Sequence, residues 1–110
     1  MATTYELIAS NTVGSGGASS VTFSSIPQTY TDLKVVFSLR SSNAAVDDAT
    51  FLRFGSNSSI DTGSNYSYKY LRGNGSSASS GSSSPQTFIY VGQGVANNAT
   101  SNTFGNGEIY

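Results

Sequence analysis

The sequence contains no cysteine, no histidine and no tryptophan, and only two prolines. Without cysteine the chain can form neither disulfides nor thiolate metal sites. Without histidine it also lacks the commonest general base in enzymes and the other usual zinc ligand. A Ser-His-Asp triad is therefore excluded, and we expect neither a cofactor nor a metal.

Charged residues are also scarce, with five Lys and Arg, six Asp and Glu, and a net charge of −1. The basic residues are scattered, and no basic run is present that could collect phosphates, which argues against nucleic acid as a partner. The first ten residues lack the cationic start and apolar stretch of a signal peptide, and no run has the apolar length that crosses a bilayer. We expect a soluble protein made in a cytoplasm.

Hydroxyl side chains are abundant, because Ser (22) and Thr (11) occupy 33 of the 110 positions. Leu, Ile, Val and Phe occupy only 23 positions, close to the roughly 20% below which chains tend to stay disordered. The low net charge and seven tyrosines favour folding all the same. We expect a thin core in a single domain over residues 1–110, or in the N-terminal part of a larger one.

Short runs of alternating apolar and polar residues, separated by turn residues, predict strands rather than helices. These runs are Tyr5–Ser10, Val21–Ile26, Leu33–Ser41, Thr50–Ser56, the tyrosine run Tyr66–Leu71, Gln86–Gln93 and Thr103–Tyr110. Their number and spacing predict an all-β fold, an antiparallel sandwich or barrel, and we favour a jelly-roll-like β-sandwich. Its predicted core comprises Leu33, Val35, Phe37, Leu39, Leu52, Phe54, Phe88 and Tyr90.

Two segments are predicted as loops. The segment 41–49 contains Asp47 and Asp48, and residues 73–85 form a Ser/Gly-rich stretch that is typical of a flexible loop. The last run ends at Tyr110 in what resembles the opening of a strand with no partner. Folded proteins normally pair or cover such an edge. We therefore expect the sandwich to be incomplete without a neighbouring subunit or further strands.

Two short motifs could carry chemistry, and both are more typical of turns. The sequence Asp61-Thr62-Gly63 offers oxygen ligands for calcium, but the spacing matches neither the EF-hand nor the nonapeptide calcium loop. We expect the Asp61 side chain to bond its own backbone and Gly63 to adopt a positive φ. The segment Gly14–Gly17 lacks the lysine and helix of a phosphate loop and is also predicted as a turn.

The tyrosine run carries the candidate contact residues. On a strand, Tyr66, Tyr68 and Tyr70 would line one face, with Lys69 and Leu71 on the other. Such a strip either stacks on sugar rings or packs, inward or against a neighbouring subunit. We favour packing, because the scarce aliphatic residues leave the tyrosines to fill space. The candidates for contacts with a partner or a glycan are Tyr66, Tyr68, Tyr70 and Tyr110.

Two stretches resemble virion structural proteins of tailed bacteriophages, particularly marine and cyanobacterial phages. The first is "VTFSSIPQTYTDLKVVFSLRSS", with its corner from Ile26-Pro27 to Leu33, and the second is "FLRFGSNSSIDTGSNYSYKYLRGNGSSASSGSSS", with its turn from Asp61 to Ser67. The resemblance covers most of Tyr5–Tyr110. Similar chains continue with more strands beyond a segment like Gly107–Tyr110, so the family's C-terminal half is expected to be missing.

The resemblance implies a capsid decoration protein, a head fibre or a tail fibre component, located in the virion and without enzymatic activity. We expect it to form homo-oligomers and to contact other virion proteins, capsid or tail subunits, through β-mediated contacts. The alternative is a carbohydrate-binding module of a tail fibre that recognises host surface glycans. Neither function involves a membrane.

Overall fold

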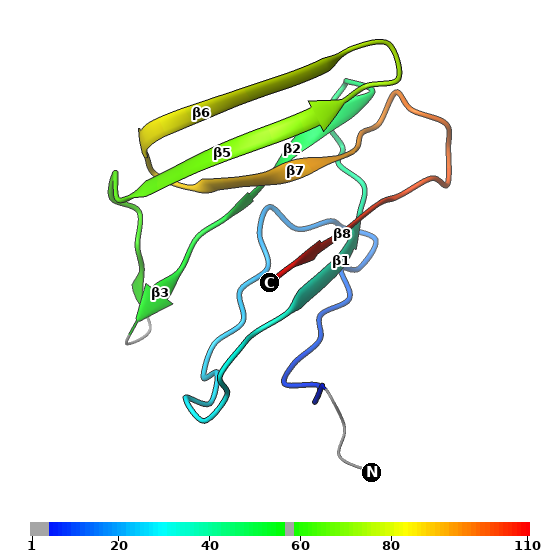
Figure 1. The fold of residues 1–110 in the computed structure, drawn as a ribbon. Coiled ribbons are helices and arrows are strands. Elements are labelled where there is room, and N and C mark those ends of the chain that lie inside the picture. The colour runs from blue at the N-terminus through cyan, green and yellow to red at the C-terminus, as the bar shows by residue number, and fades with distance from the viewer. Residues whose placement is uncertain (1–4, 57–58) are drawn as a thin grey trace. The chain divides into compact units, whose positions relative to one another are not determined.

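Strands are the only regular elements in the computed structural model, which describes residues 5–56 and 59–110 (Figure 1). Every ladder between named strands is antiparallel, so the predicted all-β, antiparallel class is confirmed. The chain divides into two compact units, Met1–Thr31 and Asp32–Tyr110. The prediction of one sandwich domain over residues 1–110 stays a prediction.

The described part of the N-terminal unit, residues 5–31, contains no strand, so the predictions for Tyr5–Ser10 and Val21–Ile26 are wrong. Alternation indicates which side chains could share a face, but a strand also needs a neighbour that completes its hydrogen bonds. In addition, Ser25 adopts a φ of 56°, which interrupts an extended run. The turn at Gly14–Gly17 is confirmed by the 3.0 Å hydrogen bond from the Gly17 N–H to the Gly14 carbonyl.

The larger unit contains the eight strands that are found among the described residues. They are β1 (Val35–Leu39), β2 (Asp47–Leu52), β3 (Gly55–Ser56), β4 (Ser59–Ile60), β5 (Tyr66–Gly73), β6 (Ala78–Gln86), β7 (Ile89–Val95) and β8 (Gly105–Ile109). They form four two-stranded pairs, namely β1–β8, β2–β7, β3–β4 and β5–β6. A sandwich of two larger sheets stays a prediction.

Two predicted loops contain strand residues. Asp47 and Asp48 belong to β2 and pair with Val95 and Gly94 of β7, so the prediction of a loop up to Ala49 is wrong. Most of the predicted flexible loop 73–85 is strand β6, which pairs with β5 in the register Tyr70↔Gly81 (Figure 1). The ladder of backbone hydrogen bonds does not require apolar side chains, so a Ser/Gly-rich strand can form beside a strand that supplies them.

The prediction that the last strand lacks a partner is also wrong. Strand β8 pairs with β1 over its whole length, from Val35↔Ile109 to Leu39↔Gly105. The paired residues are separated in sequence by almost the full length of the larger unit. No local pattern in Gly107–Tyr110 predicts this pairing. Gly105 also approaches β7 closely, because a Cβ there would lie 2.9 Å from the Gly94 Cα.

The core is thinner than predicted. Among the described residues only Tyr66 and Ala96 are buried hydrophobic residues. Of the predicted core, Leu33, Leu39 and Phe54 are exposed, and the rest are half-buried. A two-stranded ribbon covers little area, so the side chains on its inward face stay partly exposed to solvent.

Two aromatic rings cover glycines on the neighbouring strand. A Cβ on Gly107 would collide with the ring of Phe37, which lies opposite it in the β1–β8 ladder. A Cβ on Gly81 would lie 2.8 Å from the ring of Tyr70, its partner in the β5–β6 ladder. In both pairs the glycine leaves room for the ring on the strand surface.

We expect Gly107→Ala and Gly81→Ala each to lower the free energy of unfolding by about 1–3 kcal/mol, because the added methyl group forces the ring to move. Urea unfolding followed by tyrosine fluorescence measures this. Gly16→Ala is the matched control, because a Cβ at Gly16 meets no atom within 4 Å. Equal stability of all three variants would contradict the packing described here.

Candidate functional site

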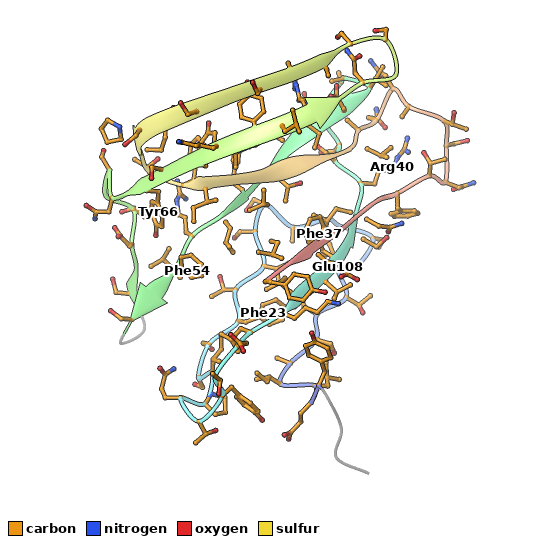
Figure 2. All side chains as sticks on the ribbon, viewed as in Figure 1. Phe23, Phe37, Arg40, Phe54, Tyr66 and Glu108 are labelled. Atoms are coloured by element: carbon orange, nitrogen blue, oxygen red, sulfur yellow. The ribbon has the colours of Figure 1, made fainter. Side chains whose placement is uncertain are left out.

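Tyr66 is a structural residue of the larger unit and not a surface contact. Its side chain is buried, and its hydroxyl accepts a hydrogen bond from the Phe54 N–H at 3.1 Å (Figure 2). The same hydroxyl lies 3.0 Å from the Asp61 carbonyl and 3.2 Å from the Phe54 carbonyl, either of which can accept its proton. Tyr66 thereby links the two ends of the β3–β4 hairpin.

The turn after this hairpin uses the side chain of Asp61 as predicted. The Gly63 N–H donates to Asp61 Oδ1 at 2.8 Å, and the Asn65 amide donates to both carboxylate oxygens at 3.0–3.1 Å. The predicted positive φ of Gly63 is wrong, since Gly63 is not among the glycines with positive φ. A Cβ at Gly63 would lie 2.8 Å from the Asn65 Nδ2, so a larger residue there would displace the Asn65 side chain.

Tyr68 and Tyr70 join an aromatic cluster with rings of β2, β7 and the segment between β6 and β7. Tyr90 of β7 lies at its centre, with ring centroids 5.8 Å from both Tyr68 and Tyr70. Phe88 lies 6.4 Å from Tyr68 and 4.2 Å from Phe51. These separations are typical of favourable ring pairs, each worth about 0.5–1.5 kcal/mol beyond burial.

The aromatic cluster bears on whether the predicted tyrosine strip packs within the chain or forms a surface for a ligand. Tyr68 and Tyr70 are half-buried against rings of their own chain, in line with the packing interpretation. The β5–β6 ladder has a register shift between Tyr66 and Tyr68, and none of the ring contacts described involves Tyr66. The three tyrosines therefore do not form one continuous surface for a ligand.

Tyr110 is the only one of the four candidates with an exposed side chain, at 80% exposure. Its hydroxyl donates to Glu108 Oε2 at 3.1 Å, and the same oxygen lies 2.8 Å from Lys34 Nζ. Lys34 Nζ also lies 4.9 Å from the centre of the Tyr110 ring. This site, which we call the Tyr110 site, combines an exposed ring and an exposed carboxylate with the half-buried ammonium group of Lys34.

The ion pair fixes the charge states of the Tyr110 site. The Lys34 ammonium, followed by the Tyr110 hydroxyl, lowers the pKa of Glu108. Glu108 and then Tyr110 raise the pKa of Lys34. Both groups are therefore charged at neutral pH, and salt weakens their attraction at this solvent-accessible position.

A second carboxylate, Asp48, is also held in its charged form. The Ser41 hydroxyl donates to Asp48 Oδ2 at 2.6 Å, and the Ala49 N–H donates to Oδ1 at 2.9 Å. These two hydrogen bonds, in that order, lower the pKa of Asp48. A general acid needs the opposite shift, so neither Asp48 nor Glu108 is set up to donate a proton near neutral pH.

Arg40 organises one loop, a role that no pattern in the sequence predicts. Its guanidinium donates to the carbonyls of Asn97, Ala99, Thr100 and Thr103 at 2.9–3.1 Å (Figure 2). A planar guanidinium with five N–H donors can satisfy several carbonyls at once. In the sequence Arg40 appears only as a polar residue at the end of a strand, so no local pattern reveals this role.

Tyr66→Phe tests whether the buried hydroxyl holds the hairpin. We expect it to lower the free energy of unfolding by about 1–3 kcal/mol, because the Phe54 N–H loses its acceptor. Tyr68→Phe is the matched control from the same strand, since its hydroxyl makes no hydrogen bond within the described residues. A Tyr68→Phe loss as large as the Tyr66→Phe loss, measured by urea unfolding, would contradict this assignment.

The geometry of the described residues thus comprises a partly buried aromatic cluster, an exposed Tyr110 site and four two-stranded sheets. No protein-family model, curated protein or solved structure matches this chain.

Proposed function

We propose that this protein is a non-enzymatic structural subunit of a phage virion that completes its packing against neighbouring subunits. The observation that carries this proposal is the small extent of burial. Only two hydrophobic residues of the described chain are buried, whereas Leu71 is 82% exposed and Val36 and Val46 are each 65% exposed. Such apolar surface is typical of chains that bury it in an assembly.

The strand edges support the same proposal. Each sheet in the described part of the larger unit has two strands, so the outer edges of the strands carry backbone groups that no ladder pairs. One exception is the Val95 carbonyl of β7, which accepts a 2.8 Å hydrogen bond from the Ser41 N–H. An isolated pair of strands is marginal in water, and a further strand adds hydrogen bonds along its whole edge. Another polypeptide can supply that strand through β-augmentation, in which the backbone provides affinity and side-chain pockets provide specificity.

The carboxylates favour a structural role over catalysis. Asp48, Asp61 and Glu108 each accept hydrogen bonds from neighbouring groups of the chain. The pKa values of Asp48 and Glu108 are lowered, so both stay ionised where a hydrolase would need one protonated acid. The chain has no histidine or cysteine to replace them.

The assignment to a virion rests on the resemblance of residues 21–42 and 51–84 to structural proteins of tailed phages. Capsid decoration, head fibre and tail fibre are the positions that this resemblance implies. The partners are other capsid or tail subunits and further copies of the chain. Detection of the chain in purified particles by a specific antibody tests this part of the proposal.

A carbohydrate-binding role is the second candidate, and the Tyr110 site is the observation that favours it. An exposed ring beside an ionised carboxylate can stack on a sugar and accept hydrogen bonds from its hydroxyls. The packing of Tyr68 and Tyr70 against Phe88 and Tyr90 leaves them poorly placed for this role. Hits on a glycan array that disappear in Tyr110→Ala would favour this candidate.

Assembly through exposed apolar surface predicts that the purified chain self-associates as its concentration rises. We expect Leu71→Ser to weaken that association about tenfold in Kd, because an exposed leucine contributes about 1.5–3 kcal/mol when it becomes buried. Sedimentation velocity over a concentration series measures the effect.

Lys69→Ser is the matched control, since Lys69 is exposed two residues earlier on the same strand but is not apolar. We expect it to leave the association within about twofold of wild type, because a rim charge contributes little affinity. A wild-type chain that stays monomeric at every concentration, together with its absence from purified particles, would overturn the proposal.

A further inference from the structure

Asn74 lies in the connection between β5 and β6, where its side-chain carbonyl is surrounded by donors. Asn74 Oδ1 accepts hydrogen bonds from the N–H groups of Ser76 and Ser77, at 3.1 and 2.9 Å. It also accepts from the hydroxyls of the same two serines, at 3.0 and 3.3 Å. The Asn74 N–H donates to the Ser77 carbonyl at 3.1 Å and closes the turn.

The next residue, Gly75, is open and unhindered. It adopts a φ of +89°, and a Cβ placed there would meet no atom within 4 Å. In the part of the chain that the structure describes, its N–H makes no backbone hydrogen bond outside the ladders. Gly75 is thus exposed, and no backbone hydrogen bond of this kind holds its N–H.

From this geometry we infer that Asn74 is a site of spontaneous deamidation. The Gly75 nitrogen loses its proton to solvent base and attacks Asn74 Cγ, and the Cγ–Nδ2 bond then breaks as ammonia leaves with a proton. Water opens the resulting succinimide at either carbonyl, giving aspartate or isoaspartate. One water enters and one ammonia leaves, and nothing is oxidised or reduced.

The donors around Asn74 Oδ1 lie where the reaction develops negative charge. When the Gly75 nitrogen adds to Cγ, the amide oxygen becomes an oxyanion, and hydrogen-bond donors already directed at it stabilise that state. Because the turn is exposed to water, this effect is far smaller than in a closed active site. The Ser76 and Ser77 hydroxyls are thus positioning groups for the modification.

The chain contains a second Asn-Gly pair that serves as an internal comparison. Asn106 and Gly107 lie inside β8, opposite Ser38 and Phe37 of β1, with the Phe37 ring over Gly107. The ladder holds this backbone extended, and ring closure requires the strand to open first. The fold therefore directs the modification to Asn74 and protects Asn106, although the two dipeptides are chemically identical.

The modification would change the hairpin in two ways. Aspartate adds a negative charge to a chain whose net charge is −1, and its carboxylate oxygen still accepts the four hydrogen bonds of the turn. Isoaspartate inserts an additional backbone carbon between β5 and β6 and disturbs the pairing of Gly73 with Ala78. The two products therefore differ in their effect on the stability of the hairpin.

Incubation of the full-length protein at mildly alkaline pH, followed by tryptic digestion and tandem mass spectrometry, tests the inference. No Lys or Arg follows Arg72, so one tryptic peptide, 73–110, carries Asn74 near its start and Asn106 near its end. We expect Asn74 to deamidate at least about tenfold faster than Asn106 in the folded protein. In urea, where the fold is lost, we expect the two rates to converge.

The double variant Ser76→Ala, Ser77→Ala removes two donors and keeps both N–H groups. We expect it to slow deamidation of Asn74 severalfold and to leave the rate at Asn106 unchanged. Circular dichroism checks that the variant keeps its strands. Equal rates at the two asparagines in the folded protein, or an unchanged Asn74 rate in a folded double variant, would overturn the inference.

Discussion

The contacts that Tyr90 makes with Tyr68 and Tyr70 are the interaction on which the joining of the two central strand pairs depends. The β5–β6 and β2–β7 pairs share no ladder, so side chains have to join them. The aromatic cluster does this, with a side-chain hydrogen bond of 3.1 Å from Arg72 to Gln93 beside it. Because the rings are only half-buried, the contact between the two strand pairs has a specific geometry but contributes only modestly to the free energy of unfolding.

Because few side chains are buried in the core, much apolar surface stays exposed. A serine-rich strand such as β6 (Ala78–Gln86) satisfies backbone hydrogen bonds and contributes almost nothing to a core, so β5 and β7 supply the rings. Leu71, on the outward-facing side of β5, stays exposed to solvent. The same composition that gives a thin core thus gives a surface suited to assembly, and the proposed structural role follows from it.

Sequence patterns predicted the class and the central strands, because alternation and turn residues are local signals. The runs around Val35–Leu39 and Ile89–Val95 were found this way, as was the Asp61 turn. Strand β6 was missed because its residues carry no apolar alternation, and the β1–β8 pairing because its partners are distant in sequence. Among site residues, the packing of Tyr68 and Tyr70 was predictable from the scarcity of aliphatic residues, whereas the loop contacts of Arg40 were not.

Tyr90→Ala tests most directly whether the aromatic cluster holds the larger unit together, with urea unfolding and amide hydrogen exchange as measurements. The account predicts a loss of about 2 kcal/mol or more in the free energy of unfolding and faster exchange along β6. Phe104→Ala is the control, because Phe104 is 55% exposed and contacts none of the rings of the cluster. Wild-type stability and unchanged exchange along β6 in Tyr90→Ala would contradict the account.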